Sequence, residues 1–223
     1  MTISTQITES VKEVTPARAT RVRKPKEIPG ISRVMTYEEY MVSPVDKTRY
    51  DVVDGWKIYR KYGAKNLPSP TQAHQDIVLN LGEAFRAFQR SAQQGRVMIA
   101  PRDVLISRRP LRTRQPDVLF ISNGRLENNV PSDDPVPLTP APELVVEILS
   151  PSDTRRVQTA KITDYVSVDV NECWLVSIEA ETVEILELTS SEIKTVAVYG
   201  RGQTVSSVIF PGLTVNVHTI FAE

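Results

Sequence analysis

One acidic residue lies inside an otherwise apolar run and is followed by a helix that carries a lysine. Residues 144–149 are apolar except for Glu147, a pattern typical of a buried central strand. A carboxylate in such a strand is unfavourable unless a positive charge or hydrogen bonds compensate it. Residues 150–153, Ser-Pro-Ser-Asp, end the strand and offer an N-cap. In the helix that follows, Lys161 and Tyr165 are four residues apart and share a face.

A second apolar run begins with an acid. Gln115-Pro116-Asp117 precedes the apolar residues 118–121. If the two runs are neighbouring strands, Asp117 and Glu147 converge. Adjacent carboxylates repel, and a divalent cation such as Mg²⁺ or Mn²⁺ is the usual remedy. Lys161 could then stabilise a developing phosphate charge or orient a water molecule.

The composition is that of an ordinary soluble protein. The chain has 223 residues, of which 40% are hydrophobic and 24% charged, and its formal net charge is zero. This indicates one domain with a substantial core and no overall bias toward nucleic acid. No apolar run has membrane-spanning length and no signal-peptide pattern opens the chain. The single Cys173 permits no intrachain disulfide, so we expect a cytoplasmic protein with a buried, unreactive thiol.

The charge is distributed unevenly along the chain. Residues 1–30 contain six basic and three acidic residues together with three prolines. This segment is predicted to be a disordered basic arm. It either contacts a phosphate backbone or an acidic partner, or is a solvated tail. Residues 31–223 are predicted to form a single domain that ends in β-hairpins.

Turn and capping signals divide this domain into elements. Thr36 and Glu39 have the spacing of a capping box, and Asp54-Gly55 is a strong hairpin signal between residues 50–53 and 56–62. Apolar residues at helical spacing predict a long helix over 72–94 that Gly95 ends. The other predicted elements are strands at 97–100, 104–106, 118–121 and 144–149, a loop at 122–141, a helix at 153–168, a hairpin at 172–188, and short strands at 193–200 and 204–221. This order predicts an α/β (α+β) fold with a mixed β-sheet flanked by helices.

Taken in order, these motifs resemble a known family. The chain is similar to the restriction-endonuclease-like proteins of the Uma-two family, within the PD-(D/E)XK nuclease superfamily. The resemblance covers about residues 33–188. It implies a restriction-endonuclease-like core and a Mg²⁺- or Mn²⁺-dependent endonuclease that hydrolyses DNA. It rests on MTYEEY at 35–40, YDVVDG at 50–55, PSP at 68–70 with His74, QPDV at 115–118, VVEILSPS at 145–152, and Lys161 with Tyr165.

The resemblance also assigns roles to single residues. Asp117 and Glu147 match the family's metal-binding acids, and the carbonyl of Ile148 would be a further metal ligand. The superfamily's lysine two residues after the second acid is replaced by Leu149. Lys161 matches the lysine that the family has on the next helix instead.

Three further residues are assigned less directly. Asp51 stands where the family has a glutamate and is a candidate catalytic residue, or else a polar residue of the hairpin. Tyr165 and His74 are candidate auxiliary residues. The alternatives are a core-edge aromatic for Tyr165 and a capping or surface role for His74. For Glu147 the alternative is a structural ion pair with Lys161, and for Asp117 it is a cap at the start of its strand.

The region after the first hairpin departs from the family pattern. Trp56 and Lys57 follow the Asp-Gly turn where the family has an acid, and three more basic residues, Arg60, Lys61 and Lys65, come before Pro68. Together with the shorter acid at Asp51, this indicates a retuned or a decayed site. The alternative function is therefore a catalytically degenerate DNA-binding or protein-interaction module, and a third is a scaffold without nucleic-acid contacts.

A DNA endonuclease needs a basic surface beside its acids. Several arginines lie close in sequence to the two candidate strands. A homodimer would allow two sites to cut two strands, although no sequence feature indicates one. The arginines expected to contact nucleic acid are Arg108, Arg109, Arg112, Arg114, Arg155 and Arg156.

Overall fold

The computed structural model describes residues 34–44, 46, 48–62, 69–128, 136–150 and 153–222. The chain divides into two units, Met1–Arg33 and Val34–Glu223, and all described residues belong to the second. The predicted basic arm at 1–30 lies outside them. None of the helices in the described ranges is long and apolar enough to cross a membrane.

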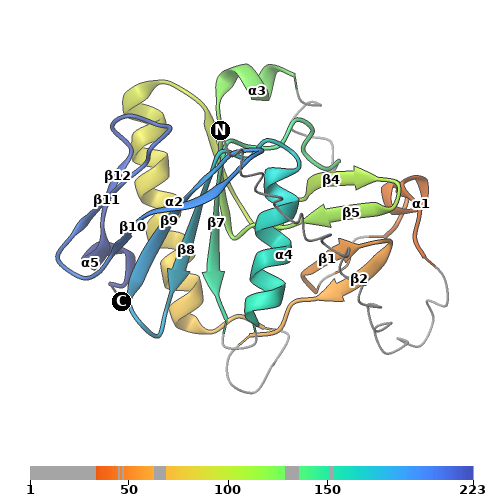
Figure 1. Ribbon diagram of the computed structural model, residues 1–223, viewed down its shortest axis with the longest axis horizontal. Helices are drawn as coiled ribbons and strands as arrows, with labels where there is room; N and C mark the ends of the chain where they lie inside the picture. The colour runs from red at the N-terminus through yellow and green to blue at the C-terminus, as the bar shows by residue number, and fades with distance from the viewer. Residues whose placement is uncertain are drawn as a thin grey trace, which may run out of the picture. The chain divides into compact units, whose positions relative to one another are not determined.

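A six-stranded mixed sheet forms the centre of the domain, as predicted (Figure 1). Its order is β10-β9-β8-β7-β6-β3, and only β7 and β8 run parallel. The run with the lone acid is β7, which has neighbours on both sides and is buried along most of its length. The strands are β3 (Arg96–Ile99), β6 (Val118–Ile121), β7 (Leu144–Leu149), β8 (Glu172–Ser177), β9 (Thr182–Leu188) and β10 (Ile193–Tyr199).

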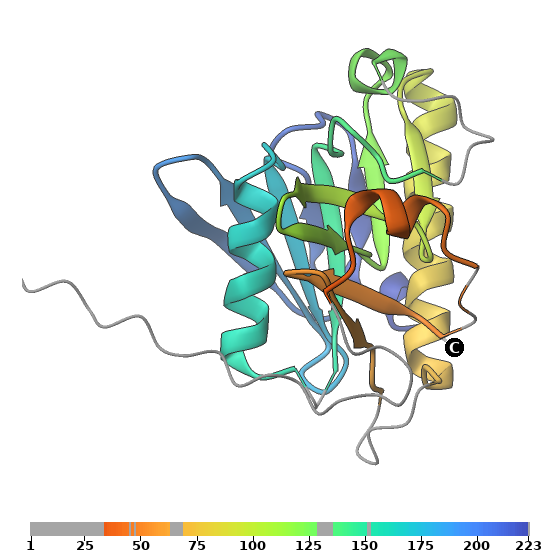
Figure 2. The same ribbon diagram turned by 90° about the vertical axis from the view of Figure 1, so that its right-hand side faces the viewer.

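One long helix covers each face of this sheet (Figure 2). The apolar stripe of α2 (Gln72–Ala92), including Leu81 and Phe85, packs in one core cluster with Phe120 and Trp174. The helix α4 (Arg155–Val166) covers the other face, where its Tyr165 packs in a second cluster with strand residues that include Leu119 and Val145. Because side chains alternate across a strand, the two faces of β6 and β7 belong to different clusters.

A smaller antiparallel sheet, of order β2-β1-β5-β4, lies beside the large one. The predicted hairpin of β1 (Tyr50–Val53) and β2 (Trp56–Tyr59) is confirmed, with Asp54 and Gly55 both at positive φ. A Cβ at Gly55 would lie 2.1 Å from a side-chain atom of Val34, so the turn requires glycine. The other strands are β4 (Val104–Arg108) and β5 (Leu111–Arg114), and α1 (Tyr37–Met41) begins at the predicted capping box.

The structure corrects several predicted elements. The basic segment 107–114 contains the end of β4, a turn and the whole of β5, which pairs with β4 in a hairpin. Only the first strand of this hairpin was predicted. The 122–141 connection contains α3 (Asn123–Glu127). The α4 helix begins after Thr154, whose hydroxyl accepts from the Val157 amide, while Asp153 accepts from the Ser150 amide instead. Serine, threonine and aspartate all cap well, so the sequence alone did not select among them.

The C-terminal region ends in a helix rather than in strands alone. The strands β11 (Thr204–Ser206) and β12 (Thr214–Asn216) form a separate two-stranded sheet, and α5 (Val217–Ile220) follows. Buried Glu172 on β8 accepts hydrogen bonds from the hydroxyl of Ser207 and from the amides of Val208 and Ile209. These bonds hold the segment between β11 and β12 against the large sheet.

Candidate active site

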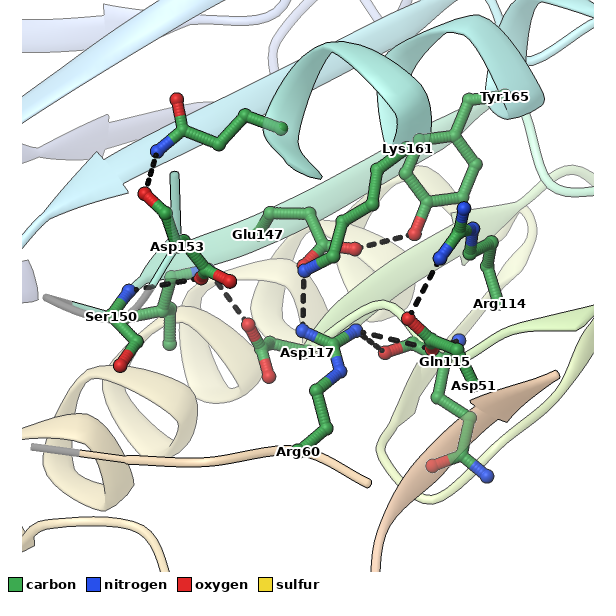
Figure 3. Close-up of polar contacts among 12 residues, drawn as sticks. Asp51, Arg60, Arg114, Gln115, Asp117, Glu147, Ser150, Asp153, Lys161 and Tyr165 are labelled. Atoms are coloured by element: carbon green, nitrogen blue, oxygen red, sulfur yellow. Dashed lines mark hydrogen bonds and ion pairs between the residues drawn. The ribbon is translucent and has the colours of Figure 1, made fainter. Parts of the chain in front are cut away.

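The two predicted acids lie beside each other on neighbouring antiparallel strands (Figure 3). The Asp117 amide, directly before β6, donates to the Val146 carbonyl at 2.9 Å. The Ile148 amide of β7 donates to Asp117 Oδ2 at 2.7 Å. The register that pairs Leu119 with Val145 therefore continues to bring Asp117 next to Glu147, as the sequence predicted.

Glu147 faces α4 because Val145, two residues earlier, packs on the α4 side of the sheet. Its Oε2 accepts from Lys161 Nζ at 2.8 Å and its Oε1 accepts from the Tyr165 hydroxyl at 2.5 Å. Arg60 NH1 lies 3.2 Å from the same Oε2. Burial acts to raise the pKa of Glu147, but the charges of Lys161 and Arg60 outweigh it and lower the pKa. The acid is thus ionised and has three donors.

Asp117 is similarly enclosed by donors. Its Oδ1 lies 2.5 Å from Arg49 NH1 and 3.4 Å from His74 Nε2. Burial again acts to raise the pKa of Asp117, and the charge of Arg49 followed by the hydrogen bond from His74 lowers it well below the usual range. His74, in the first turn of α2, is therefore buried against Asp117 rather than on the surface.

Asp51 completes the group from the small sheet. Arg114 NH1 donates to its Oδ2 at 3.1 Å, the Gln115 amide donates to its Oδ1 at 3.1 Å, and Arg60 NH2 lies 3.5 Å away. We call Asp51, Asp117 and Glu147 the carboxylate cluster. The side chains of all three residues are nearly inaccessible to solvent.

Two arginines of this site were not assigned by the sequence. Arg49 directly precedes β1 and Arg60 directly follows β2. The two ends of the hairpin therefore place the Arg49 guanidinium beside Asp117 and the Arg60 guanidinium beside Glu147. The unusual basic residues after the hairpin were a signal for Arg60. Arg49 had none, because nothing in the local sequence shows a pairing across 68 positions.

The six candidate DNA-binding arginines occupy three different environments. Arg114 is only 5% exposed and joins Asp51 to Asp164 of α4. This buried position is incompatible with a contact between Arg114 and a DNA phosphate, and it places Arg114 in the interior of the site. Arg112 is partly exposed and bonds Asp54 and Asp164. The remaining four are exposed, on the β4–β5 hairpin and at the start of α4: Arg108, Arg109, Arg155 and Arg156.

The site offers oxygen atoms of the kind that bind a divalent metal. Carboxylate oxygens of Asp117 and Glu147 and the Ile148 carbonyl are hard ligands of the kind that Mg²⁺ and Mn²⁺ prefer. The cluster is ionised, so its oxygens attract a cation, and Arg49, Arg60, Arg114 and Lys161 already supply positive charge. All six of its carboxylate oxygens already have a donor from this chain. No group of three His, Cys, Asp or Glu side chains in the described ranges is arranged to hold a metal ion.

Two cavities adjoin the cluster. One of about 580 Å³ is lined by Asp117, His74 and Arg49, among other residues. The other, of about 240 Å³, is lined by Asp51, Ile148, Lys161 and Arg60, among others. Asp117 therefore borders the larger cavity and Asp51 the smaller one, whereas Glu147 is among the lining residues of neither.

Acidification is expected to destabilise the fold through Asp51. Burial acts to raise the pKa of Asp51, but Arg60 and Arg114 lower it to about 2 from 3.8. Because the folded-state pKa is depressed, the stabilisation is present above about pH 4 and is lost as pH falls toward 2. The shift corresponds to about 2 kcal/mol. Urea unfolding at a series of pH values measures it, and Asp51→Asn should flatten the curve below pH 4. An unchanged acid limb in that variant would contradict the assignment.

A solved structure shares the fold of this chain. The crystal structure of "a putative nuclease belonging to DUF820 from Anabaena variabilis" superposes with a TM-score of 0.62 at 16% identity, covering 84% of this chain and 97% of that one. No curated protein matched the chain. At this identity the likeness shows the fold alone.

The family follows from a second comparison. The profile of the Uma2 family, described as "putative restriction endonuclease", matches residues 37–218. The chain belongs to the Uma2 family, and the resemblance seen in the sequence is confirmed.

Proposed function

We propose that this protein is a metal-dependent DNA endonuclease that hydrolyses phosphodiester bonds. The observation that carries the proposal is the meeting of Asp117 and Glu147 on neighbouring strands, with Lys161 Nζ 2.8 Å from Glu147. Two ionised carboxylates beside a buried lysine are suited to positioning a phosphate and a nucleophilic water. Membership of a family of restriction endonucleases supports the same reaction.

Asp117, Glu147 and the carbonyl of Ile148 would hold Mg²⁺ or Mn²⁺. When bound, the ion would polarise a phosphate oxygen and lower the pKa of a coordinated water. In a strand, the N–H and C=O groups of one residue point to the same neighbour. The Ile148 carbonyl therefore lies on the side of Asp117, to which its amide already donates.

The neighbouring side chains would prepare the acids for this role. Tyr165 donates to Glu147 Oε1 and so fixes the carboxylate orientation. Lys161 reaches Glu147 from α4 and lines the smaller cavity, where its ammonium could contact a phosphate or the attacking water. Asp51 does not touch Glu147 directly in this arrangement. We propose that it positions Arg60 and Arg114 through its ion pairs.

The DNA-binding surface is assigned to exposed basic residues near the site. Arg155 and Arg156 lie in the first turn of α4, where positive charge is unfavourable to the helix dipole. A nearby phosphate would offset that repulsion. Arg108 and Arg109 extend from the β4–β5 hairpin, and Arg108 lies over the ring of Tyr37 at 4.7 Å. Contacts of this type bind the DNA backbone without reading its sequence.

One observation favours a second candidate, a catalytically degenerate DNA-binding or protein-interaction module. Arg49 and Arg60 neutralise the acids that a metal would use. A site that is already charge-balanced can be structural. The fold alone does not decide between the two candidates.

Incubation of wild-type protein with supercoiled plasmid tests the proposal. We expect nicking with Mg²⁺ or Mn²⁺ and none with EDTA, and linearisation would indicate that two sites act together, as in a homodimer. Calorimetry with each metal provides the stoichiometry. Folded protein that binds neither metal and leaves plasmid intact would contradict the nuclease and favour the binding module.

A further inference from the structure

Arg60 lies at the centre of the carboxylate cluster (Figure 3). Its amide donates to the Arg49 carbonyl at 2.9 Å, which continues the pairing of the hairpin beyond β2. Its guanidinium lies 3.2 Å from Glu147 Oε2 and 3.5 Å from Asp51 Oδ1, and donates to the Gln115 carbonyl at 2.8 Å. One buried cation therefore connects two of the three acids.

The guanidinium is retained there by charge. Burial acts to lower the pKa of Arg60, but Asp51, Glu147 and Asp117 raise it well above the ordinary value. Its Nε has no hydrogen-bond partner among the described residues, and a buried unpaired donor is unfavourable. The negative charge of the acids therefore holds the Arg60 guanidinium in its buried position, although the hydrogen bonding of Arg60 is incomplete.

A divalent metal would meet the same need at the same oxygens. Glu147 Oε2 cannot fully serve both the guanidinium and a metal, and the positive charges repel at this range. We propose that Arg60 is a resident cation that competes with the divalent metal for Glu147, so that metal binds only as the Arg60 side chain withdraws. This inference rests on the proposed function, since it concerns the same metal site.

Arg60 is the partner of Glu147 that is most easily displaced. Charge-assisted N–H···O⁻ bonds are typically about 2.7–2.9 Å long, and both contacts of Arg60 with carboxylates exceed that range. Lys161 at 2.8 Å is within it and is fixed on α4. Arg60 also lines the 240 Å³ cavity, which gives its long side chain space to move.

Metal binding to matched variants tests the competition. Mn²⁺ titrations followed by electron paramagnetic resonance would compare the wild type with Arg60→Gln, Arg60→Lys and Arg90→Gln. Loss of one nearby positive charge in a partly screened site predicts at least about tenfold tighter Mn²⁺ binding for Arg60→Gln. Arg60→Lys keeps the charge and should bind more like the wild type. Arg90→Gln makes the same chemical change in the exposed last turn of α2 and should leave the affinity unchanged.

Each outcome is decisive. Equal affinities of the wild type and a folded Arg60→Gln would overturn the competition and leave the proposed metal site intact. Absence of binding in both would overturn the two proposals together. If Arg60→Gln does not fold by circular dichroism, Arg60→Met replaces it, because its apolar stem fills similar space.

Displacement of Arg60 can also be tested in the wild-type protein by nuclear magnetic resonance, without a variant that removes the charge. The Arg60 Nε–H signal in a ¹H–¹⁵N spectrum can be assigned by its absence from Arg60→Lys. Saturation with diamagnetic Mg²⁺ should shift this signal more than that of Arg90. A stationary Arg60 signal in a protein that has bound Mg²⁺ would contradict displacement.

Discussion

Replacing Arg114 with alanine is expected to lower the free energy of unfolding by about 3–5 kcal/mol, the usual effect of removing one partner from a buried ion pair. Its guanidinium lies 3.1 Å from Asp51 and 2.5 Å from Asp164, and the residue is 5% exposed. The change would leave two buried carboxylates short of a cation. It would also remove one of the two β5 arginines that join the small sheet to α4, because Arg112 and Arg114 both bond Asp164.

Urea unfolding followed by circular dichroism measures this effect. Arg112→Ala is the matched control because Arg112 bonds the same Asp164 at 2.6 Å but is partly exposed. Partly exposed pairs contribute about 1 kcal/mol or less, so its loss should be several times smaller. Equal losses in the two variants would show that burial does not set the strength of this network.

Replacing Glu147 with glutamine is expected to reduce metal-supported plasmid cleavage by at least about 10²-fold. Glutamine keeps the side-chain shape but removes the charge that Lys161 and a metal ion would share. The Tyr165 hydroxyl can still donate to the amide oxygen, so the local arrangement is expected to persist. Calorimetry should show weaker Mg²⁺ binding in the same variant.

Two controls separate lost chemistry from lost structure. Glu187→Gln makes the same change on β9, where Glu187 is exposed and lies 4.0 Å from Lys194, and it should cleave like the wild type. Thermal unfolding checks Glu147→Gln, because Lys161 loses its buried partner. A folded Glu147→Gln that nicks plasmid at the wild-type rate would exclude Glu147 as a metal ligand.

Local sequence patterns predicted most of the elements that form the site. The apolar run around Glu147 indicated the central strand β7, and Asp54-Gly55 indicated the β1–β2 hairpin. Helical periodicity located α2 to within two residues. Such signals work because they reflect short-range backbone preferences and the alternation of buried and exposed faces. The β5 strand was missed because Leu111 is its only apolar residue, and Arg114 is buried through ion pairs that the local sequence does not show.

The sequence by itself also determined that Glu147 needs a compensating charge and that Lys161 and Tyr165 face the same way. Only the tertiary structure decided which cations satisfy the carboxylate cluster. Arg60 reaches Glu147 across 87 positions and Arg49 reaches Asp117 across 68. Those pairings depend on how the small sheet lies against the large one, and no local pattern encodes that. A buried charge requires a partner but does not specify it, because long-range packing determines which side chain arrives.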